Sequence, residues 1–361
     1  MKKVIIVGGG YAGTTLARAL DTSFEVVLVE PRDAFVHNVA SIRALVDPNL
    51  LDSIILPYDR LLKRGRVVRD RVSAVSEGAV TLASGARLLA DYVVLATGTS
   101  YAQPFKPATD SSDDFRAASA ATNAAIKAAR SVAIVGGGAV GVELAGEIAS
   151  TLKGKSVTLV SSTRVLFPDF APGLGARLAA DLKGLGVSVM SGAQAKDLTG
   201  IDRPQPGPLT LDSGAVVEAD LVIPAIGAKP VTGVVCGLAN ARFDAIGRVE
   251  TDGWMRPAGL KTVFALGDMA ANGDLMTIVA SSRQAPWLAK TLEALASGTA
   301  IESLPRYSAW PSPPILVPLG PSHGASVLPV TKKGLVVGPF LTGLIKGKSL
   351  FIPRYHKEFG L

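Results

Sequence analysis

A glycine-rich turn between an apolar run and a helix-like segment occurs twice in this chain of 361 residues. Residues 4–13 read VIIVGGGYAG, and residues 132–141, which lie 128 positions further on, read VAIVGGGAVG. Each copy follows a run typical of a buried strand and precedes a pattern typical of an amphipathic helix. One such turn is weak evidence for a ligand, but two in this context predict two dinucleotide-binding sites in one molecule.

The three glycines of each turn have separate physical roles. The first lets the chain leave the strand sharply, the second lets backbone N–H groups approach a pyrophosphate, and the third lets the helix pack closely on the sheet. The positive end of the helix dipole then faces the phosphates. The alternative is a tight turn without a ligand, which the matched pair disfavours. We therefore assign dinucleotide binding to Gly8, Gly10, Gly13, Gly136, Gly138 and Gly141.

A longer repeat surrounds these turns. Residues 81–98 match residues 210–227 at an offset of 129, and each stretch predicts a hairpin around Ser-Gly followed by a buried strand. With the preceding strand-helix-strand pattern, this predicts an α/β fold in which a unit of roughly ninety residues occurs twice as a Rossmann-like domain. We add the residues at the ends of the repeated strands, Thr97, Gly98 and Gly227, to the cofactor-binding candidates.

The surroundings of the first turn favour FAD. Glu30 follows the second apolar run, 22 residues after Gly8, where an acidic side chain accepts hydrogen bonds from the ribose hydroxyls of an adenosine. A later buried strand ends in Gly267-Asp268, and we expect the Asp268 carboxylate beside the first turn, where it can accept from a ribityl hydroxyl. A helix predicted over about 277–292 would point its N-terminus at the flavin and stabilise the reduced anion.

The second glycine turn has no acidic counterpart of Glu30. Its corresponding strand is followed by Ser161, Ser162, Thr163 and Arg164. No carboxylate is there to repel a 2′-phosphate, and Arg164 with the hydroxyls could bind one. We therefore expect NADPH, or both NADPH and NADH, at this site, with Ser161 and Arg164 as candidate ligands. In the alternative interpretation, Arg164 is simply solvated.

Composition limits the classes of function. Hydrophobic residues make up 48% of the chain, and no apolar stretch is long enough to span a membrane, so we expect a globular protein. The net charge of +7 is spread along the chain, which disfavours a nucleic-acid partner. Because residues 1–3 lead directly into the first predicted strand without a signal-peptide pattern, we expect a cytoplasmic protein.

The chain has one cysteine, Cys236. Enzymes of this architecture that pass electrons through a disulfide need two thiols, so a dithiol relay within this chain is excluded. Electrons must therefore leave the flavin directly. We interpret Cys236 itself as a small core residue.

Three further segments carry a resemblance to a known family. Residues 35–44 read FVHNVASIRA, residues 141–147 read GVELAGE and residues 342–351 read TGLIKGKSLF. Together with the glycine turns, they resemble the FAD- and NAD(P)H-dependent oxidoreductases of the AIF-like, ferroptosis suppressor type, and the resemblance runs from residue 4 to about residue 352. It implies that hydride passes from NAD(P)H to FAD and that reduced FAD then reduces a small-molecule quinone.

The same resemblance implies roles for particular side chains. It places His37 near the isoalloxazine, Glu143 near the contact between nicotinamide and flavin, and Lys346 near the flavin or the quinone. These three are the catalytic candidates, and Arg43 joins the cofactor-binding set. Each catalytic candidate has an alternative: His37 as a structural core residue, Glu143 as a residue that orients helix packing, and Lys346 as a solvated lysine.

The identity of the electron acceptor stays open at this level. Arg283 and Pro286, within the helix predicted after Asp268, depart from the pattern of that family. One alternative function is reduction of a protein carrier of the rubredoxin or ferredoxin type, since a basic surface would suit an acidic partner. Another is an AIF-like redox-signalling or DNA-binding role, which the lack of a basic run disfavours.

We expect three domains. An FAD-binding domain would be discontinuous and comprise residues 1–102 and 230–300, with an NAD(P)H-binding domain at 103–229 between the two parts. Residues 301–361 would form a small C-terminal α+β domain.

The C-terminal domain has a mixed character. It opens with a proline-rich stretch that we interpret as an irregular linker and continues with predicted strands at 326–330 and 334–338. From Thr331 onward, six Lys and Arg residues stand against one acid and alternate with apolar residues. This mixture suits peripheral docking on the cytosolic face of an anionic membrane, and equally a homodimer contact.

Overall fold

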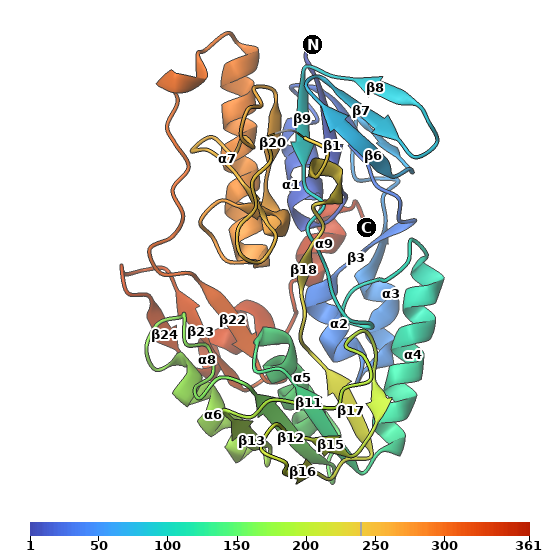
Figure 1. Ribbon diagram of the computed structural model, residues 1–361, viewed down its shortest axis with the longest axis vertical. Coiled ribbons are helices and arrows are strands. Elements are labelled where there is room, and N and C mark those ends of the chain that lie inside the picture. Colours follow the sequence, from blue (N-terminus) through green and yellow to red (C-terminus); the bar gives the residue numbers. More distant parts are fainter. Residues whose placement is uncertain (239) are drawn as a thin grey trace.

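Two parallel sheets, one for each repeat, form the framework of the computed structural model, which describes residues 1–238 and 240–361 (Figure 1). The first sheet has parallel strands in the order β20-β9-β1-β2-β5. Runs of Val, Ile and Leu form these strands because both faces of the sheet are covered. The strands are β1 (Lys3–Val7), β2 (Glu25–Val29), β5 (Arg66–Val68), β9 (Tyr92–Leu95) and β20 (Val263–Ala265).

Different elements cover the two faces of the first sheet. Helices α1 (Tyr11–Leu20) and α7 (Ile278–Ala296) pack side by side on the face that carries Val4 and Ile6. A three-stranded antiparallel sheet covers the opposite face, which carries Ile5. Its strands are β6 (Val72–Ser76), β7 (Ala79–Leu82) and β8 (Arg87–Leu89). A separate group of elements forms the connection from β2 to β5: β3 (Ala34–Val36), α2 (Asn38–Ala44), a 3-10 turn (Pro48–Leu50), α3 (Leu51–Ile54) and β4 (Ile55–Pro57).

The second sheet repeats the arrangement of the first. In the order β13-β12-β11-β17-β14, the central strands β12-β11-β17 correspond to β2-β1-β9, and only β14 is antiparallel. The predicted fold class is therefore confirmed. The strands are β11 (Ser131–Val135), β12 (Ser156–Ser161), β13 (Ser188–Ser191), β14 (Gln205–Pro206) and β17 (Leu221–Pro224), the hairpin is β15 (Leu209–Thr210) with β16 (Val216–Val217), and the helices are α4 (Ser112–Ala128), α5 (Ala139–Thr151) and α6 (Leu174–Gly184).

The chain crosses between the two units twice, and the crossings pair with each other. Strand β10 (Thr99–Ser100) leaves the first unit and forms an antiparallel ladder with β18 (Lys229–Pro230), which returns to it. After the return, β19 (Val249–Glu250) pairs with β21 (Ala270–Ala271), and β20 completes the first sheet. The first unit is thus built from two separate stretches of sequence.

The C-terminal stretch contains a three-stranded antiparallel sheet, β22 (Ile315–Pro318), β23 (Gly324–Leu328) and β24 (Leu335–Val337). Two of these strands match the predicted ones. The interpretation of the proline-rich stretch as wholly irregular is wrong from Ile315 onward, because the apolar run before Pro318 pairs with β23 and buries Val317. This edge strand tolerates Pro318 at its end, where a missing N–H breaks no ladder.

Short helices follow this sheet and lead back to the first unit (Figure 1). Helix α8 (Pro339–Thr342) continues into a π-helical turn (Gly343–Gly347) and then, after two left-handed residues, into α9 (Ile352–Glu358). Tyr355 of α9 and the following Phe359 are buried with Phe35 and Tyr58 of the first unit. The segment 352–359 therefore packs on the first unit rather than on the C-terminal sheet.

The structure corrects the prediction for the single cysteine. Cys236 is exposed, so its interpretation as a core residue is wrong. It follows a 3-10 turn (Gly233–Val235) in which Val235 points into the core and the next residue faces solvent.

Candidate functional site

The first glycine turn leaves open space at the position where a phosphate is expected. A Cβ on Gly8, which has a φ of +106°, would collide with the Ala96 carbonyl, and one on Gly13 would overlap the Gly8 carbonyl oxygen. A Cβ on Gly10 would meet no atom within 4 Å. Helix α1 begins at Tyr11, so its free N–H groups and positive dipole end face this space. The turn fits a bound pyrophosphate.

The second turn has the same construction. Gly136 has a φ of +131° and lies against the Ala225 carbonyl, and a Cβ on Gly141 would overlap the Gly136 carbonyl oxygen. Gly138 again faces open space, and α5 begins directly after it at Ala139. The molecule therefore holds two matched anion-binding helix ends, as the doubled motif predicts.

Glu30 lies at the carboxyl end of β2, next to the first turn. Its carboxylate accepts from the backbone N–H of Gly9 and from the Arg32 guanidinium at 2.7 and 3.0 Å. Burial opposes ionisation, but Arg32 and the backbone donors outweigh it and lower the pKa of Glu30. Tyr58 donates to the Gly9 carbonyl at 2.9 Å. A fixed, ionised acceptor suits a ribose, and Arg32, two residues after the acid, is a site residue that the sequence analysis missed.

Asp268 lies beside the crossing between the units. Its carboxylate accepts from the Thr99 hydroxyl at 3.1 Å and lies 3.8 Å from the Lys106 ammonium. Gln284 of α7 accepts from the Gly267 N–H at 2.8 Å and so fixes this turn to the start of the helix. Burial lowers the pKa of Lys106, although Asp268 opposes that shift. Lys106 is a second residue that was missed, because it lies in a loop without a motif.

Three predicted cofactor-binding residues lie at the ends of repeated strands. Thr97 donates to the Val231 carbonyl, and the Gly98 carbonyl accepts from the Val231 N–H at 2.9 Å. Gly98 and Gly227 have φ values of +65° and +85°, which favour glycine. These residues shape the exits from β9 and β17, and their contact with a cofactor stays a prediction.

His37 is fully buried, and both of its ring nitrogens have partners. Nε2 lies 2.6 Å from the Leu350 carbonyl oxygen, so it donates, and Nδ1 accepts from the Tyr11 hydroxyl at 2.9 Å. Burial lowers the pKa of His37 to about 4, which keeps the imidazole neutral at pH 7. The structure favours the core interpretation of His37, since the ring ties α1 to the turn before α9. Its place near the isoalloxazine stays a prediction.

The two charged catalytic candidates form a buried ion pair. The Lys346 ammonium lies 2.6 Å from the Glu143 carboxylate and also donates to the Leu316 carbonyl at 3.0 Å. Their residues are 4% and 7% exposed, so the interpretation of Lys346 as a solvated lysine is wrong. Burial raises the pKa of Glu143 to about 7, although Lys346 opposes that shift. The structure thus brings α5 and the C-terminal segment together at one ionisable site.

A second buried ion pair lies one helical turn away. Arg43 of α2 binds the Glu147 carboxylate through Nε and Nη2 at 2.7–3.0 Å, and its Nη1 donates to the Gly347 carbonyl at 2.6 Å. Arg43 therefore ties α2, α5 and the C-terminal segment together, and its contact with a cofactor stays a prediction. Glu147 was missed because its partner lies 104 residues away in the sequence.

Strand register identifies the counterpart of Glu30 in the second unit. The last pair of the β1–β2 ladder precedes Glu30, and the last pair of the β11–β12 ladder precedes Ser161. A Cβ on Gly9 would touch the Glu30 side chain, and one on Gly137 would touch the Ser161 hydroxyl. Ser161 therefore stands where the first unit has its acid. Arg164, three residues on, is exposed.

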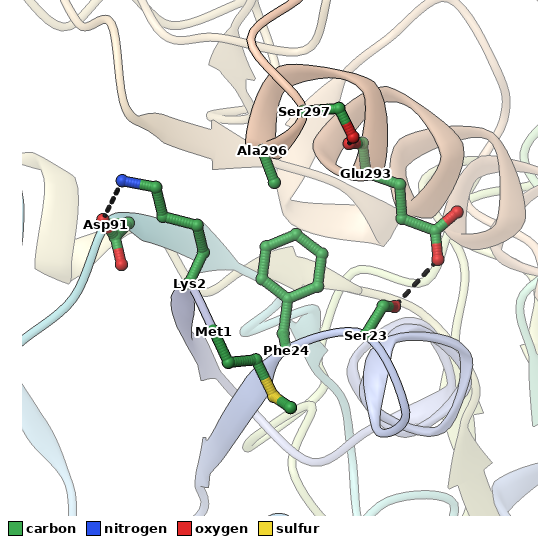
Figure 2. Close-up of a pocket in the computed structure, with 8 residues that line it drawn as sticks. All are labelled: Met1, Lys2, Ser23, Phe24, Asp91, Glu293, Ala296 and Ser297. Carbon is green, nitrogen blue, oxygen red and sulfur yellow. Dashed lines mark hydrogen bonds and ion pairs between the residues drawn. The ribbon is translucent and has the colours of Figure 1, made fainter.

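A surface hollow elsewhere in the molecule is separate from these groups. Figure 2 shows it at the C-terminal end of α7, around the Phe24 ring, between the Lys2–Asp91 ion pair and the Ser23–Glu293 hydrogen bond. At 1.5 Å per residue, α7 (Ile278–Ala296) places this end about 27 Å from the start of the helix, which lies on the side of Gly267. The hollow is therefore not the cofactor seat.

Two further observations concern metals and membranes. Across residues 1–238 and 240–361, no cluster of His, Cys, Asp and Glu side chains could hold a metal ion. In the same part of the chain, no helix combines the length and the apolar character needed to cross a bilayer.

Two glycine turns at the carboxyl ends of two parallel sheets, with Glu30 and Asp268 beside the first, define a flavoprotein with two dinucleotide-binding domains. The chain belongs to the pyridine nucleotide-disulphide oxidoreductase family, whose model matches residues 2–285. Its cofactors are accordingly FAD and NAD(P)H, and the residues at both turns fit them. The predicted family is confirmed.

Relatives and solved structures agree with this family. The apoptosis-inducing factor homolog B of Dictyostelium discoideum is 31% identical over 98% of this chain and 96% of its own length. Ferroptosis suppressor protein 1 of Homo sapiens is 26% identical over 97% of this chain and 93% of its own. The covalent putidaredoxin reductase–putidaredoxin complex shares the fold, with a TM-score of 0.70 and 20% identity over 90% of this chain and 81% of that one.

Proposed function

We propose that this oxidoreductase passes electrons from NAD(P)H to a quinone. The observation that carries the proposal is the two-sided character of residues 339–347. On the inner side, Lys346 pairs with Glu143, and on the outer side Phe340 and Leu344 are 80% and 61% exposed. An amphiphilic acceptor would therefore meet an apolar surface directly outside a buried ionisable pair. The single exposed cysteine leaves no dithiol relay in the chain.

The overall reaction balances as NAD(P)H plus a proton plus quinone to NAD(P)+ plus quinol. FAD, when bound, supplies the two-electron relay between the nicotinamide and the acceptor. The residues around it bind and orient: the two glycine turns receive the pyrophosphates, Glu30 accepts from ribose and Asp268 fixes the ribityl side. Glu143, with a pKa of about 7, takes up and releases a proton near neutral pH.

We further propose that NADPH is the preferred donor. Ser161 replaces the acid at the position equivalent to Glu30, so no carboxylate repels a 2′-phosphate. The Ser161 and Thr163 hydroxyls lie 2.9 Å apart, and the exposed Arg164 guanidinium is available as a phosphate ligand.

The C-terminal segment also supports a proposal about where the acceptor is met. Five of the exposed large apolar side chains fall within residues 330–344 and lie among exposed lysines. We propose that this apolar segment docks on an anionic lipid surface, where a lipid quinone is concentrated. The apolar side chains are Val330, Leu335, Phe340, Leu341 and Leu344, and the lysines are Lys332, Lys333 and Lys348.

Stopped-flow reduction of the FAD-loaded protein tests the central proposal. We expect NADPH to bleach the flavin absorbance and a short-chain quinone to restore it much faster than dissolved oxygen does. Reoxidation by the quinone no faster than by oxygen would overturn the proposal. Faster reoxidation by an iron–sulfur carrier protein than by any quinone would favour the alternative of a protein acceptor.

A further inference from the structure

A buried carboxylate lies a few residues after the turn that carries Asp268. Asp274 is 8% exposed, and its side chain accepts three hydrogen bonds. The donors are the Gln284 amide at 3.0 Å, the Trp310 backbone N–H at 3.3 Å and the Tyr307 hydroxyl. Gln284 belongs to α7, whereas the other two donors belong to the segment that leads from α7 to the C-terminal sheet. One acidic side chain therefore joins this segment to α7.

Asp274 decides which end of the Gln284 amide faces the turn. A carboxylate can only accept hydrogen bonds, so the amide presents Nε2 to it. The other end of the amide, Oε1, then accepts from the backbone N–H of Gly267 at 2.8 Å. Gln284 is buried, so both hydrogen bonds lie in the core. Without the acid the amide would be free to turn over, and Nε2 would then face the Gly267 N–H, one donor against another.

The turn that Gln284 holds lies against the start of α1. A Cβ on Gly267, which has a φ of +75°, would lie 3.0 Å from the Cβ of Ala12, the second residue of that helix. The next residue is Asp268, whose carboxylate accepts from the Thr99 hydroxyl at 3.1 Å. The Gln284 amide thus fixes the backbone of the turn, and Thr99 fixes its acidic side chain. A shift of this backbone would move the Asp268 carboxylate relative to the first glycine turn.

We propose that Asp274 is a positioning residue for FAD, which orients the Gln284 amide and so sets the place of Asp268. The carboxylate of Asp274 is occupied by donors from the chain, so it acts on the cofactor only through Gln284. Two of these donors lie beyond α7, which makes FAD binding depend on the segment after that helix. This inference rests on one part of the proposed function, namely that Asp268 fixes the ribityl side of FAD.

Release of FAD from the full-length holoprotein on dilution, followed by flavin fluorescence at pH 8.5, tests this inference. Gln284→Glu keeps an acceptor for the Gly267 N–H but sets a second carboxylate against Asp274, and we expect the Kd of FAD to rise at least about tenfold. Asp274→Asn alone should raise it less, since its amide oxygen still accepts from Gln284. In the double variant the new amide donates to the new carboxylate, so the Kd should return to within about threefold of the native value.

Tyr307→Phe is the matched control. It removes a donor from the same carboxylate but leaves the link from Asp274 through Gln284 to Gly267 in place. We therefore expect Tyr307→Phe to lower the Tm by a few degrees, the loss of one buried hydrogen bond, and to leave the Kd of FAD within about twofold of the native value.

The outcomes separate this inference from the proposed function. If the double variant releases FAD as readily as Gln284→Glu does, the two side chains are not coupled and the inference is wrong. If Tyr307→Phe weakens FAD binding as much as Gln284→Glu does, the hydrogen bonds of Asp274 only support the fold, and the inference is again wrong. If the variants release FAD as expected but the native protein reduces no quinone, electron transfer to quinone fails as a proposal and the role of Asp274 stands.

Discussion

The buried ion pair of Glu143 and Lys346 is stable only while both charges are present. Removing either one leaves a charge in an apolar setting, which costs about 3–5 kcal/mol in comparable pairs. The pair also joins a residue of the NAD(P)H-side helix to the segment that carries Phe340 and Leu344 outward. A change in the charge of Glu143 therefore acts where α5 meets the C-terminal segment.

The raised pKa of Glu143 predicts a pH-dependent contribution to stability. Since its pKa rises from 4.5 to about 7 on folding, the folded state binds more protons in that interval, and the contribution falls as pH increases through it. We expect Glu143→Gln to remove this dependence, so that the native protein loses stability relative to the variant between pH 4.5 and 7. Urea unfolding across this range measures the difference, with the exposed Glu218→Gln as a control. If the free energies of unfolding of the native protein and the variant differed by the same amount at every pH in this range, the raised pKa of Glu143 would be contradicted.

A second prediction concerns His37. Replacing it with Phe leaves the Leu350 carbonyl without its donor, which should lower the free energy of unfolding by about 1–3 kcal/mol. Because the folded pKa of His37 is about 4, the imidazole is already neutral at pH 7, and we expect no change in the pH profile of quinone reduction above pH 6. If the variant lost a pH-dependent change in rate that the native protein shows above pH 6, His37 would instead act as a proton relay.

Single residues differ in how far the sequence reveals them. Glu143 and Lys346 lie in motifs, so each could be predicted, but only the fold shows that they are partners. Lys106 lies outside any motif, and Glu147 lies in the segment 141–147 without a predicted role of its own; each pairs with a residue more than a hundred positions away. Such pairs depend on how helices and loops meet, which no local pattern contains.

Among the elements, the end of β12 leads to a prediction about coenzyme choice. Ser161→Glu would place a carboxylate where the first unit has Glu30, next to the Gly137 N–H. We expect kcat/KM for NADPH to fall about ten- to a hundredfold and that for NADH to fall much less, because the carboxylate repels a 2′-phosphate. Ser156→Asp, at the exposed opposite end of the same strand, is the control. Equal losses for both donors would contradict the proposed preference.

Elements with strong patterns could be predicted, and those that depend on partners could not. Helix α7 forms as expected and runs four residues beyond its predicted end at 292, with the exposed Pro286 inside it. Strand β22 was missed because its prolines resemble a linker, and its identity depends on pairing with β23. The return of α9 to the first unit was also missed, since its contacts with Phe35 span more than three hundred residues.

At the scale of the whole molecule, the apolar segment at 330–344 predicts reversible membrane binding. We expect the protein to sediment with vesicles that contain anionic phosphatidylglycerol, and to be released at about 0.5 M salt, where charge attraction is screened. Phe340→Ser with Leu344→Ser should abolish this, whereas Leu89→Ser, on the distant β8 edge, should not. If the double variant changes the mass of the particle in solution and leaves vesicle binding intact, the segment is a dimer contact.

The contacts of residues 352–359 have a consequence for the order of assembly during synthesis. Phe359 packs on Phe35 and on Tyr58, whose hydroxyl holds the Gly9 carbonyl of the first glycine turn. The first sheet likewise lacks β20 until residue 265 has been made. The surroundings of the first glycine turn, where we propose that the adenosine end of FAD binds, therefore reach their final form only when nearly all of these residues have left the ribosome. We expect nascent chains that stop before residue 352 to retain FAD poorly, although they already carry both glycine turns.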